Sequence, residues 1–459
     1  MKSEKLSIAK ALRLAQIPPP RVAFVGAGGK TTAIFEVARE LAPCIVTTTT
    51  HLGAWQADKA DRHIVIRKEE DHNQLESIAF SGIILVTGKK EGERLNSLPA
   101  KSLAWLKNFA NHHCLPLLIE ADGARQKPLK APKESEPVIP RFIDTVVVVA
   151  GLSGIGKELN DESVYNAKKF AELGKIKEGE KITVESLIKV LLHKEGGLSK
   201  IPQKSKKIAL LTQSNPPKPD DIGEKVAKSL LSKYDALTTF CLQSSSHSPK
   251  PSILQTFEST SAIILAAGTS TRFGKSKQLL DYHGKTFVRT VAEKARQAEL
   301  SPVIIVTGAE HENIKTALRG LNVKIVHNPD WEEGQSSSIR AGVNALPEDT
   351  ASAIFLLCDQ PQVTQTVMRA LVEKHSKTLQ PIIAPMVKNR RANPVLFDRV
   401  TFPALLKLKG DVGGRGIFSS FPPKYILWLD SALLMDVDSP EDYEKLLKIH
   451  KNTDSFPSV

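Results

Sequence analysis

Twice along this chain, a run of β-branched and apolar residues leads into a glycine-rich turn and then into a stretch of helical periodicity. The first run is Arg21–Thr32 (RVAFVGAGGKTT) and the second is Ser261–Gly274 (SAIILAAGTSTRFG). A strand, a tight glycine turn and a helix in this order form the repeating unit of a parallel α/β sheet. Seven further apolar runs have strand length and complete the pattern: GIILVTG, PLLIEAD, DTVVVVAG and KIALLTQ in the first half, and SPVIIVTG, NVKIVHN and SAIFLLCD in the second.

The length of 459 residues exceeds what one ordinary core holds, so two domains are expected. We predict an α/β protein in which each domain has a mainly parallel sheet flanked by helices. The first domain would be P-loop-like and the second Rossmann-like. A stretch rich in serine and proline without periodicity indicates an exposed linker. The predicted boundaries are residues 1–245, a linker at 246–257, and residues 258–459.

Composition narrows the ligand classes. The net charge of +13 suggests anionic ligands, but aromatic residues make up 5% and do not alternate with basic ones. Phosphorylated small molecules are therefore expected rather than nucleic acid. No apolar run reaches the roughly 18–20 residues of a membrane span, and the first residues lack the apolar segment of a signal peptide. The 4 cysteines form no Cys-x-x-Cys pair, which argues against a zinc site and favours a cytoplasmic protein.

The second glycine turn carries the stronger chemical signal. Small residues let backbone amides approach a triphosphate, and Arg272 and Lys277 follow as cations for its oxygens. The alternative is an ordinary turn in which glycine only permits the bend. The cations at fixed offsets favour a nucleotide loop, with Arg272 and Lys277 as catalytic residues. The predicted nucleotide-binding residues of this loop are Leu265, Ala266, Ala267, Gly268, Ser270 and Gly274.

These residues resemble the signature of the molybdenum cofactor nucleotidyltransferases, and five further segments match in order. They are GQSSSIRAG, LLCDQPQVT, NPVLF, GDVGGRG and DVDSPEDY. Ala267, where the guanylyltransferases usually have glycine, resembles the cytidylyltransferase branch. The resemblance implies transfer of CMP from CTP to molybdopterin, which yields the cytosine dinucleotide cofactor of molybdenum hydroxylases and pyrophosphate.

Candidate metal ligands follow from the same segments. Asp359 comes directly after an apolar strand, where open α/β sheets bind ligands, and it is predicted as a catalytic Mg²⁺ ligand. Asp438 is the candidate for the second carboxylate, with Asp436 as the fallback. Each aspartate singly fits a helix cap or turn equally well. Ser337 and Arg340 are assigned to nucleotide binding, although the serines also fit a plain loop.

The first glycine turn has the context of a phosphate-binding loop but lacks the first glycine of the standard motif, since Phe24 occupies that position. A strand ending in Glu120 and Asp122 supplies carboxylates. Thr31 is expected to bind Mg²⁺, and Asp122 is the predicted carboxylate ligand of the metal. The alternative is a plain glycine turn and a solvent-facing acid. The predicted nucleotide-binding residues are Gly26, Gly28, Gly29, Lys30 and Thr31.

This half resembles the YqeC family, described as accessory proteins of selenium-dependent hydroxylases. The likeness rests on VGAGGKTT, TTTTHL, IEADGARQKPLKAPKESEPVIP and GLSGIGKELND. The base-reading Asn-Lys-x-Asp of GTPases is replaced by Thr212-Gln213-Ser214-Asn215, so the nucleotide stays open between ATP and GTP. The expected partners are small molecules and a recipient molybdenum hydroxylase. Two other hypotheses remain: a cofactor-delivering chaperone, and transfer of another nucleotide or to another acceptor.

Overall fold

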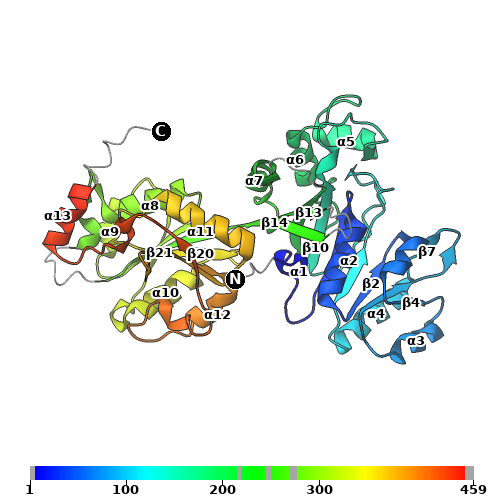
Figure 1. The fold of residues 1–459 in the computed structure, drawn as a ribbon, viewed down its shortest axis with the longest axis horizontal. Helices are drawn as coiled ribbons and strands as arrows, with labels where there is room; N and C mark the ends of the chain where they lie inside the picture. The colour runs from blue at the N-terminus through cyan, green and yellow to red at the C-terminus, as the bar shows by residue number, and fades with distance from the viewer. Residues whose placement is uncertain (1–5, 214–218, 244–249, 269–275, 450–459) are drawn as a thin grey trace. The chain divides into compact units, whose positions relative to one another are not determined.

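The computed structural model describes residues 6–213, 219–243, 250–268 and 276–449. The chain forms two compact units, Met1–Phe257 and Glu258–Val459. Figure 1 shows a sheet with surrounding helices in each unit. The predicted α/β class with two mainly parallel sheets is confirmed. Within the described residues, no helix combines the length and the apolar character needed to cross a membrane.

The N-terminal unit is built on a nine-stranded sheet in the order β14-β13-β12-β10-β1-β8-β2-β5-β4. The strands from β13 to β4 pair in parallel, so their carboxyl ends share one edge of the sheet. The four strands expected in this half from their apolar runs are all present, as β5, β8, β10 and β12. The bounds are β1 Arg21–Gly26, β2 Cys44–Thr48, β4 Arg62–Val65, β5 Ile83–Thr87, β8 Leu117–Glu120, β10 Thr145–Gly151, β12 Lys206–Thr212, β13 Ala236–Gln243 and β14 Lys250–Glu258.

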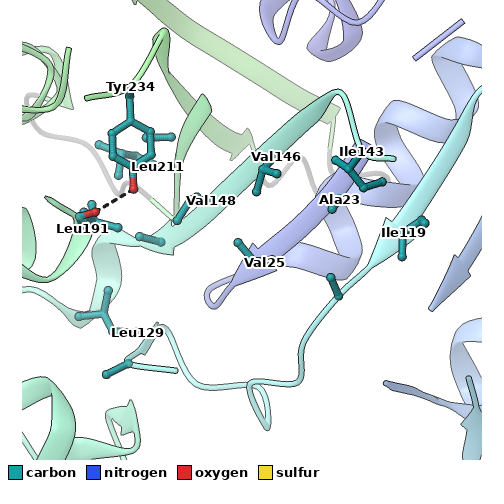
Figure 2. Close-up of a cluster of buried hydrophobic side chains, with 14 of the residues drawn as sticks. Ala23, Val25, Ile119, Leu129, Ile143, Val146, Val148, Leu191, Leu211 and Tyr234 are labelled. Atoms are coloured by element: carbon teal, nitrogen blue, oxygen red, sulfur yellow. Dashed lines mark hydrogen bonds between the residues drawn. The ribbon is translucent and has the colours of Figure 1, made fainter. Parts of the chain in front are cut away.

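Both faces of this sheet are covered, which explains why its strands are apolar throughout rather than alternating. Ala23 and Val25 of β1 pack into one core, which Figure 2 shows in part, while Val22 and Phe24 pack into the core on the opposite face. Helices α4, α5, α6 and α7 contribute to the first core and α1 and α2 to the second. The helices are α1 Ile8–Ala11, α2 Lys30–Leu41, α3 Asn73–Glu76, α4 Ala100–His112, α5 Ala167–Gly174, α6 Val184–Leu192 and α7 Pro219–Leu230.

Segments between the strands of the large sheet form two small sheets. The first pairs β3 (His51–Gly53) with β7 (Arg94–Asn96), and β7 also pairs with β6 (Lys90–Glu91). The second pairs β9 (Leu129–Lys130) with β11 (Val164–Tyr165). Along the chain, β3 follows β2, β6 and β7 follow β5, β9 follows β8, and β11 follows β10. Each short strand therefore lies in a segment that leaves the carboxyl-end edge of the large sheet.

The segment predicted as a linker takes part in the fold. Strand β14 (Lys250–Glu258) begins inside the range 246–257 and lies beside β13 in the sheet. The buried hydroxyl of Thr256 lies 3.2 Å from that of Thr238 on β13 and donates to the carbonyl of Ala11 at 3.3 Å. Serine and proline content indicated an exposed connection, whereas the pairing with β13 is a long-range contact that local composition does not report.

The C-terminal unit has an eight-stranded sheet in the order β19-β18-β15-β20-β23-β21-β22, and β24 pairs with β21. Strands β19, β18, β15 and β20 are parallel, while β23 runs antiparallel to both of its neighbours. The three strands expected in this half are present as β18, β19 and β20. The bounds are β15 Thr260–Ala266, β18 Val303–Thr307, β19 Lys324–His327, β20 Ser352–Leu357, β21 Ile382–Val387, β22 Arg390–Arg391, β23 Val395–Asp398 and β24 Lys424–Leu427.

Helices also cover both faces of the second sheet. Ile264 of β15 packs in the core formed with α8, α9, α11 and α13, whereas Ile263 packs in the core formed with α10 and α12. A short hairpin joins β16 (Asp281–Tyr282) to β17 (Lys285–Thr286) ahead of α8. The helices are α8 Phe287–Gln297, α9 His311–Ala317, α10 Gln335–Asn344, α11 Gln365–Thr378, α12 Phe402–Leu405 and α13 Pro440–Ile449.

Candidate functional site

A pocket of about 660 Å³ lies at the carboxyl ends of β15 and β20 in the C-terminal unit. The two strands are parallel neighbours, with Leu265 in register with Leu357, so the segments that follow them emerge side by side. Gly268 follows the first strand and Asp359 the second. The pocket is lined by Leu265, Ala267, Gly268, Lys277, Gln278, Trp331, Glu332, Glu333, Gly334, Gln335, Ser338, Leu357, Cys358, Asp359 and Asp411.

Four of the eight predicted residues of the second glycine turn line this pocket. Leu265, Ala267, Gly268 and Lys277 line it, and the amide of Gln278 donates to the carbonyl of Gly268 at 2.7 Å. Ala266 instead packs into the core beneath. Ser270, Arg272 and Gly274, which were predicted to hold or activate the nucleotide, lie outside the described residues.

Carboxylates gather beside the lysine. The ammonium of Lys277 lies 2.7 Å from Oδ1 of Asp438. Asp436 accepts a hydrogen bond of 2.6 Å from the amide of Gln360. Burial, together with the negative charge of Asp436, raises the pKa of Asp359 to about 6, while Lys277 acts in the opposite direction. Residues separated by 76 to 161 positions in the sequence are thus brought into one electrostatic cluster.

A divalent cation fits this cluster. Asp359 and its neighbours Asp436 and Asp438 repel one another, and a cation between carboxylates removes that penalty. Within the described residues, no group of three or more His, Cys, Asp or Glu side chains has the arrangement to hold a metal alone. A cation at Asp359 would therefore also need oxygen ligands from a substrate, which is the usual environment of Mg²⁺.

The serine-rich helix start has mainly internal contacts. The hydroxyl of Ser337 donates to the carbonyl of Gly334 and accepts from Asn328 at 2.8 Å. Arg340 donates to the carbonyl of Leu408 at 2.8 Å and pairs with Glu333 at 2.9 Å. Neither Ser337 nor Arg340 lines the pocket in this state.

Sequence reasoning did not single out several residues that line the pocket, among them Trp331 and Asp411. Gly334 and Asp411 form part of the pocket wall. The sequence signal for this wall is the glycine at position 334, whose backbone has φ +101°. A Cβ on Gly334 would come within 2.7 Å of the Asp411 backbone, so glycine is needed for this close approach. The pocket thus has a wall made by two loops that are distant in sequence.

In the N-terminal unit, the first glycine turn joins β1 to α2 through three left-handed glycines, Gly26, Gly28 and Gly29 (φ +95°, +84° and +100°). A Cβ on Gly28 would meet the backbone nitrogen of Gly151 at 2.3 Å, so the turn is packed against the end of β10. The amide of Gly28 is already bonded to the carbonyl of Lys127. The amides at 29–32 precede the first intrahelical bond of α2, from Ala33 to Gly29, and amides in this position are the ones with which a helix start can bind an anion.

Lys30 is buried at 4% exposure among carboxylates. Its ammonium lies 2.5 Å from Oδ1 of Asp122 and 3.5 Å from Oε1 of Glu120. Burial alone would lower the pKa of Lys30, but Asp122 and Glu120 outweigh it and raise that pKa. Burial raises the pKa of Glu120, and Lys30 opposes this. A second buried lysine, Lys130, lies 3.0 Å from Asp122 and 2.8 Å from Glu136.

The predicted residues of this half therefore meet at one place, the carboxyl ends of β1 and β8. Thr31, in the first turn of α2, donates to Glu120 at 3.3 Å and accepts from Gln56 at 3.3 Å. Exposed His51 follows β2 at the same edge. Burial and the charge of Arg94 lower the pKa of His51, while Glu136 acts in the opposite direction and Lys30 and Arg125 add smaller lowering effects. Charges of both signs therefore act on His51 beside the turn.

A Rossmann-like sheet with a glycine turn, a lysine and a carboxylate at adjoining strand ends is the architecture of nucleotide-handling transferases. Comparison with known families agrees. Residues 262–424 match the MobA-like NTP transferase domain, and residues 22–168 match the YqeC protein family. The chain therefore carries a MobA-like NTP transferase domain in its C-terminal half, and its N-terminal half contains a domain that matches the YqeC family.

Three relatives illustrate the two parts. An uncharacterized YqeC protein of Escherichia coli is 28% identical over 202 residues, covering 42% of this chain and 76% of that protein. A nicotine blue oxidoreductase of Paenarthrobacter nicotinovorans is 30% identical over 200 residues (40% and 95%). A molybdenum cofactor cytidylyltransferase of Escherichia coli is 26% identical over 185 residues (39% and 92%). The C-terminal unit is a nucleotidyltransferase of the molybdenum cofactor cytidylyl- and guanylyltransferase type.

Proposed function

We propose that the C-terminal unit transfers CMP from CTP to molybdopterin and releases pyrophosphate. The observation that carries this proposal is the cluster of Lys277, Asp359 and Asp438 at the mouth of the Gly268 turn. The likeness to a molybdenum cofactor cytidylyltransferase supports the choice of donor and acceptor. Ala267, which lines the pocket, is the residue that we associate with the pyrimidine nucleotide.

The proposed chemistry joins two anions. An oxygen of the terminal phosphate of molybdopterin attacks the α-phosphorus of CTP, and the bond from that phosphorus to the β-phosphate oxygen breaks. Mg²⁺ held by Asp359 and Asp438 would neutralise phosphate charge as the two substrates approach. Lys277 would then move from Asp438 to the phosphate oxygens and stabilise the negative charge of the leaving pyrophosphate. The backbone around Gly268 holds the nucleotide in place.

The test measures pyrophosphate release from the full chain with Mg²⁺, molybdopterin and each of CTP, GTP and ATP. We expect turnover with CTP and a loss of about 10²-fold or more in kcat for Asp359→Asn, the order seen when one electrostatic stabiliser of the reacting phosphates is removed. Asp349→Asn, at an exposed aspartate of the same unit, is the matched control and should retain activity.

Other outcomes distinguish the alternatives. Turnover with GTP alone would contradict the assignment of CTP. Tight binding of molybdopterin or the finished dinucleotide without turnover would favour a chaperone that delivers cofactor to a molybdenum hydroxylase. In that case Asp359→Asn should leave cofactor binding unchanged.

We further propose that the N-terminal unit binds the phosphates of a nucleoside triphosphate, either ATP or GTP, at the Gly26–Thr31 turn. The supporting observation is Lys30, a lysine buried beneath the amides that begin α2. Calorimetric titration with ATP and with GTP should show binding that Lys30→Ala abolishes. Lys168→Ala, at an exposed lysine of α5, is the control. Unchanged binding in Lys30→Ala would refute a phosphate site at this turn.

A further inference from the structure

We infer that the N-terminal unit holds a divalent cation through Thr31 and Glu120, next to the phosphates of the bound nucleotide, and that Asp122 is a structural anchor rather than a metal ligand. This inference rests on the nucleotide binding proposed for the Gly26–Thr31 turn. It keeps Thr31, which the sequence already suggested as a Mg²⁺ ligand, and differs from the sequence-based expectation in the carboxylate, which was Asp122. The ligand class is a complex of a divalent cation with a nucleoside triphosphate.

The contacts of Asp122 leave it little capacity for a metal. Oδ1 lies 2.5 Å from the ammonium of Lys30. Oδ2 lies 3.0 Å from the ammonium of Lys130 and also accepts from the amide of Gly26 at 3.0 Å. The carboxyl is thus bonded to two cations and to the glycine turn itself, with the residue 1% exposed. Its geometry stabilises the turn, and a cation placed there would displace both lysines.

Glu120 is placed differently. Its Oε2 accepts from the hydroxyl of Thr31 at 3.3 Å, a long contact, and Oε1 is 3.5 Å from Lys30. The Thr31 hydroxyl lies in the first turn of α2, where the amides that would hold phosphates are found. A hydroxyl and a carboxylate facing each other at this distance provide two oxygen ligands for a cation between them. One or two protein oxygens completed by phosphate and water oxygens is the normal coordination of Mg²⁺.

Gln56 supplies the independent evidence for a ligand at this place. It lies in the helical turn Ala54–Lys59 and is 8% exposed. Its Nε2 donates to the Thr31 hydroxyl, while its Oε1 is buried without a hydrogen-bond partner in the part of the chain that the structure describes. A buried amide oxygen without a donor is destabilising, so it indicates a missing group at this place. A water bound to the cation would donate to it.

The experiment measures the Kd of Mn²⁺ for the full chain with a non-hydrolysable ATP or GTP analogue, by calorimetry. All samples carry Asp359→Asn, which weakens cation binding at the C-terminal pocket. We expect Thr31→Val and Glu120→Gln to raise the Kd for Mn²⁺ by about tenfold or more, and Gln56→Leu to raise it by a few-fold. Thr32→Val, at the next residue of α2, is the matched control and should change the Kd less than twofold.

Asp122→Asn distinguishes a structural role of Asp122 from a role as a metal ligand. We expect it to lower the melting temperature of the N-terminal unit, because it removes the charge that Lys30 and Lys130 share. An increase in the Kd for Mn²⁺ in folded Asp122→Asn, with Thr31→Val and Glu120→Gln within twofold of the control, would overturn the inference. If Glu120→Gln does not fold, the Kd for Mn²⁺ of Thr31→Val and Gln56→Leu is compared with the control instead, and values within twofold of the control would overturn the inference.

The nucleotide titration is repeated in EDTA. Equal nucleotide affinity with and without Mn²⁺ would refute the cation site while leaving the nucleotide site intact. Absence of nucleotide binding under both conditions would refute the nucleotide site, and the cation site with it.

Discussion

Replacing Lys130 with methionine should strongly destabilise the N-terminal unit. The side chain is 1% exposed, and its ammonium contacts Asp122 at 3.0 Å, Glu136 at 2.8 Å and the carbonyl of Gly123 at 2.5 Å. It also lies 4.7 Å from the ring centre of Tyr165. Methionine keeps most of the aliphatic volume, so the change is mainly electrostatic.

The magnitude follows from the charges that remain. The buried network holds two lysines, Lys30 and Lys130, and three carboxylates, Glu120, Asp122 and Glu136, for a net charge of 2 − 3 = −1. Lys130→Met changes this sum to 1 − 3 = −2. Breaking a buried ion pair from one side typically costs about 3–5 kcal/mol, and we expect a loss in that range. Adding Glu136→Gln returns the sum to −1 and should recover about 1–2 kcal/mol.

Urea unfolding would measure these free energies, with Trp331 and Trp428 of the C-terminal unit replaced by phenylalanine. The remaining tryptophans, Trp55 and Trp105, then report on the N-terminal unit. Hydrogen exchange of β8 and β10 provides a second measure of the same opening. A loss below about 1 kcal/mol, or a double variant less stable than Lys130→Met alone, would refute the assigned electrostatic role of Lys130.

Three further predictions concern packing and charge. Gly28→Ala should cost the N-terminal unit about 3 kcal/mol or more, because φ is +84° and the Cβ meets backbone at 2.3 Å. Gly156→Ala, with φ +82° and no atom within 4 Å of the Cβ, should cost only about 1–2 kcal/mol in the same urea titration. Burial lowers the pKa of Lys294 to about 8 in the folded state, so the unfolded chain binds more protons between pH 8 and its ordinary value of 10.5. The free energy of unfolding should therefore rise by about 2 kcal/mol from pH 8 to 10 relative to Lys294→Met, and a parallel pH profile for both proteins would contradict this. His375→Leu should lower the free energy of unfolding of the C-terminal unit by about 2–4 kcal/mol, because it removes the 2.7 Å partner of fully buried Asp398. An unchanged urea midpoint would show that the pair contributes nothing.

The strands and glycine turns could be predicted from the sequence because their signals are local. A buried parallel strand must be apolar on both faces, and the two runs before Gly26 and Gly268 satisfy this over their whole length. Asp359 was identifiable for the same reason, since it directly follows such a strand. Serine and proline content indicated an exposed linker at residues 246–257, but β14 begins within that range because its pairing with β13 is set by long-range sheet contacts rather than by composition.

The parts of the sites that escaped prediction depend on contacts between distant segments. Gln56 lies 25 residues from Thr31, and nothing in its local sequence distinguishes it from a surface glutamine. The choice between Glu120 and Asp122 is likewise invisible in the sequence, because both lie at the carboxyl end of the same strand, β8. Lys130 decides between the two carboxylates because its ammonium is bonded to Asp122. Lys130 lies in β9, which pairs with β11, a contact that the local sequence does not reveal.

The two units share one electrostatic arrangement at their glycine turns. In each, a lysine that would serve phosphate is bonded to carboxylate instead: Lys30 to Asp122 and Glu120, and Lys277 to Asp438. A nucleotide arriving alone must break those pairs and bring its phosphates close to the carboxylates, which is costly. A cation arriving with the nucleotide neutralises the carboxylates and so releases the lysine toward the phosphates. Cation and nucleotide should therefore bind cooperatively at both turns. The coupling should be larger at Lys30, where burial excludes the water that screens the exposed Asp438.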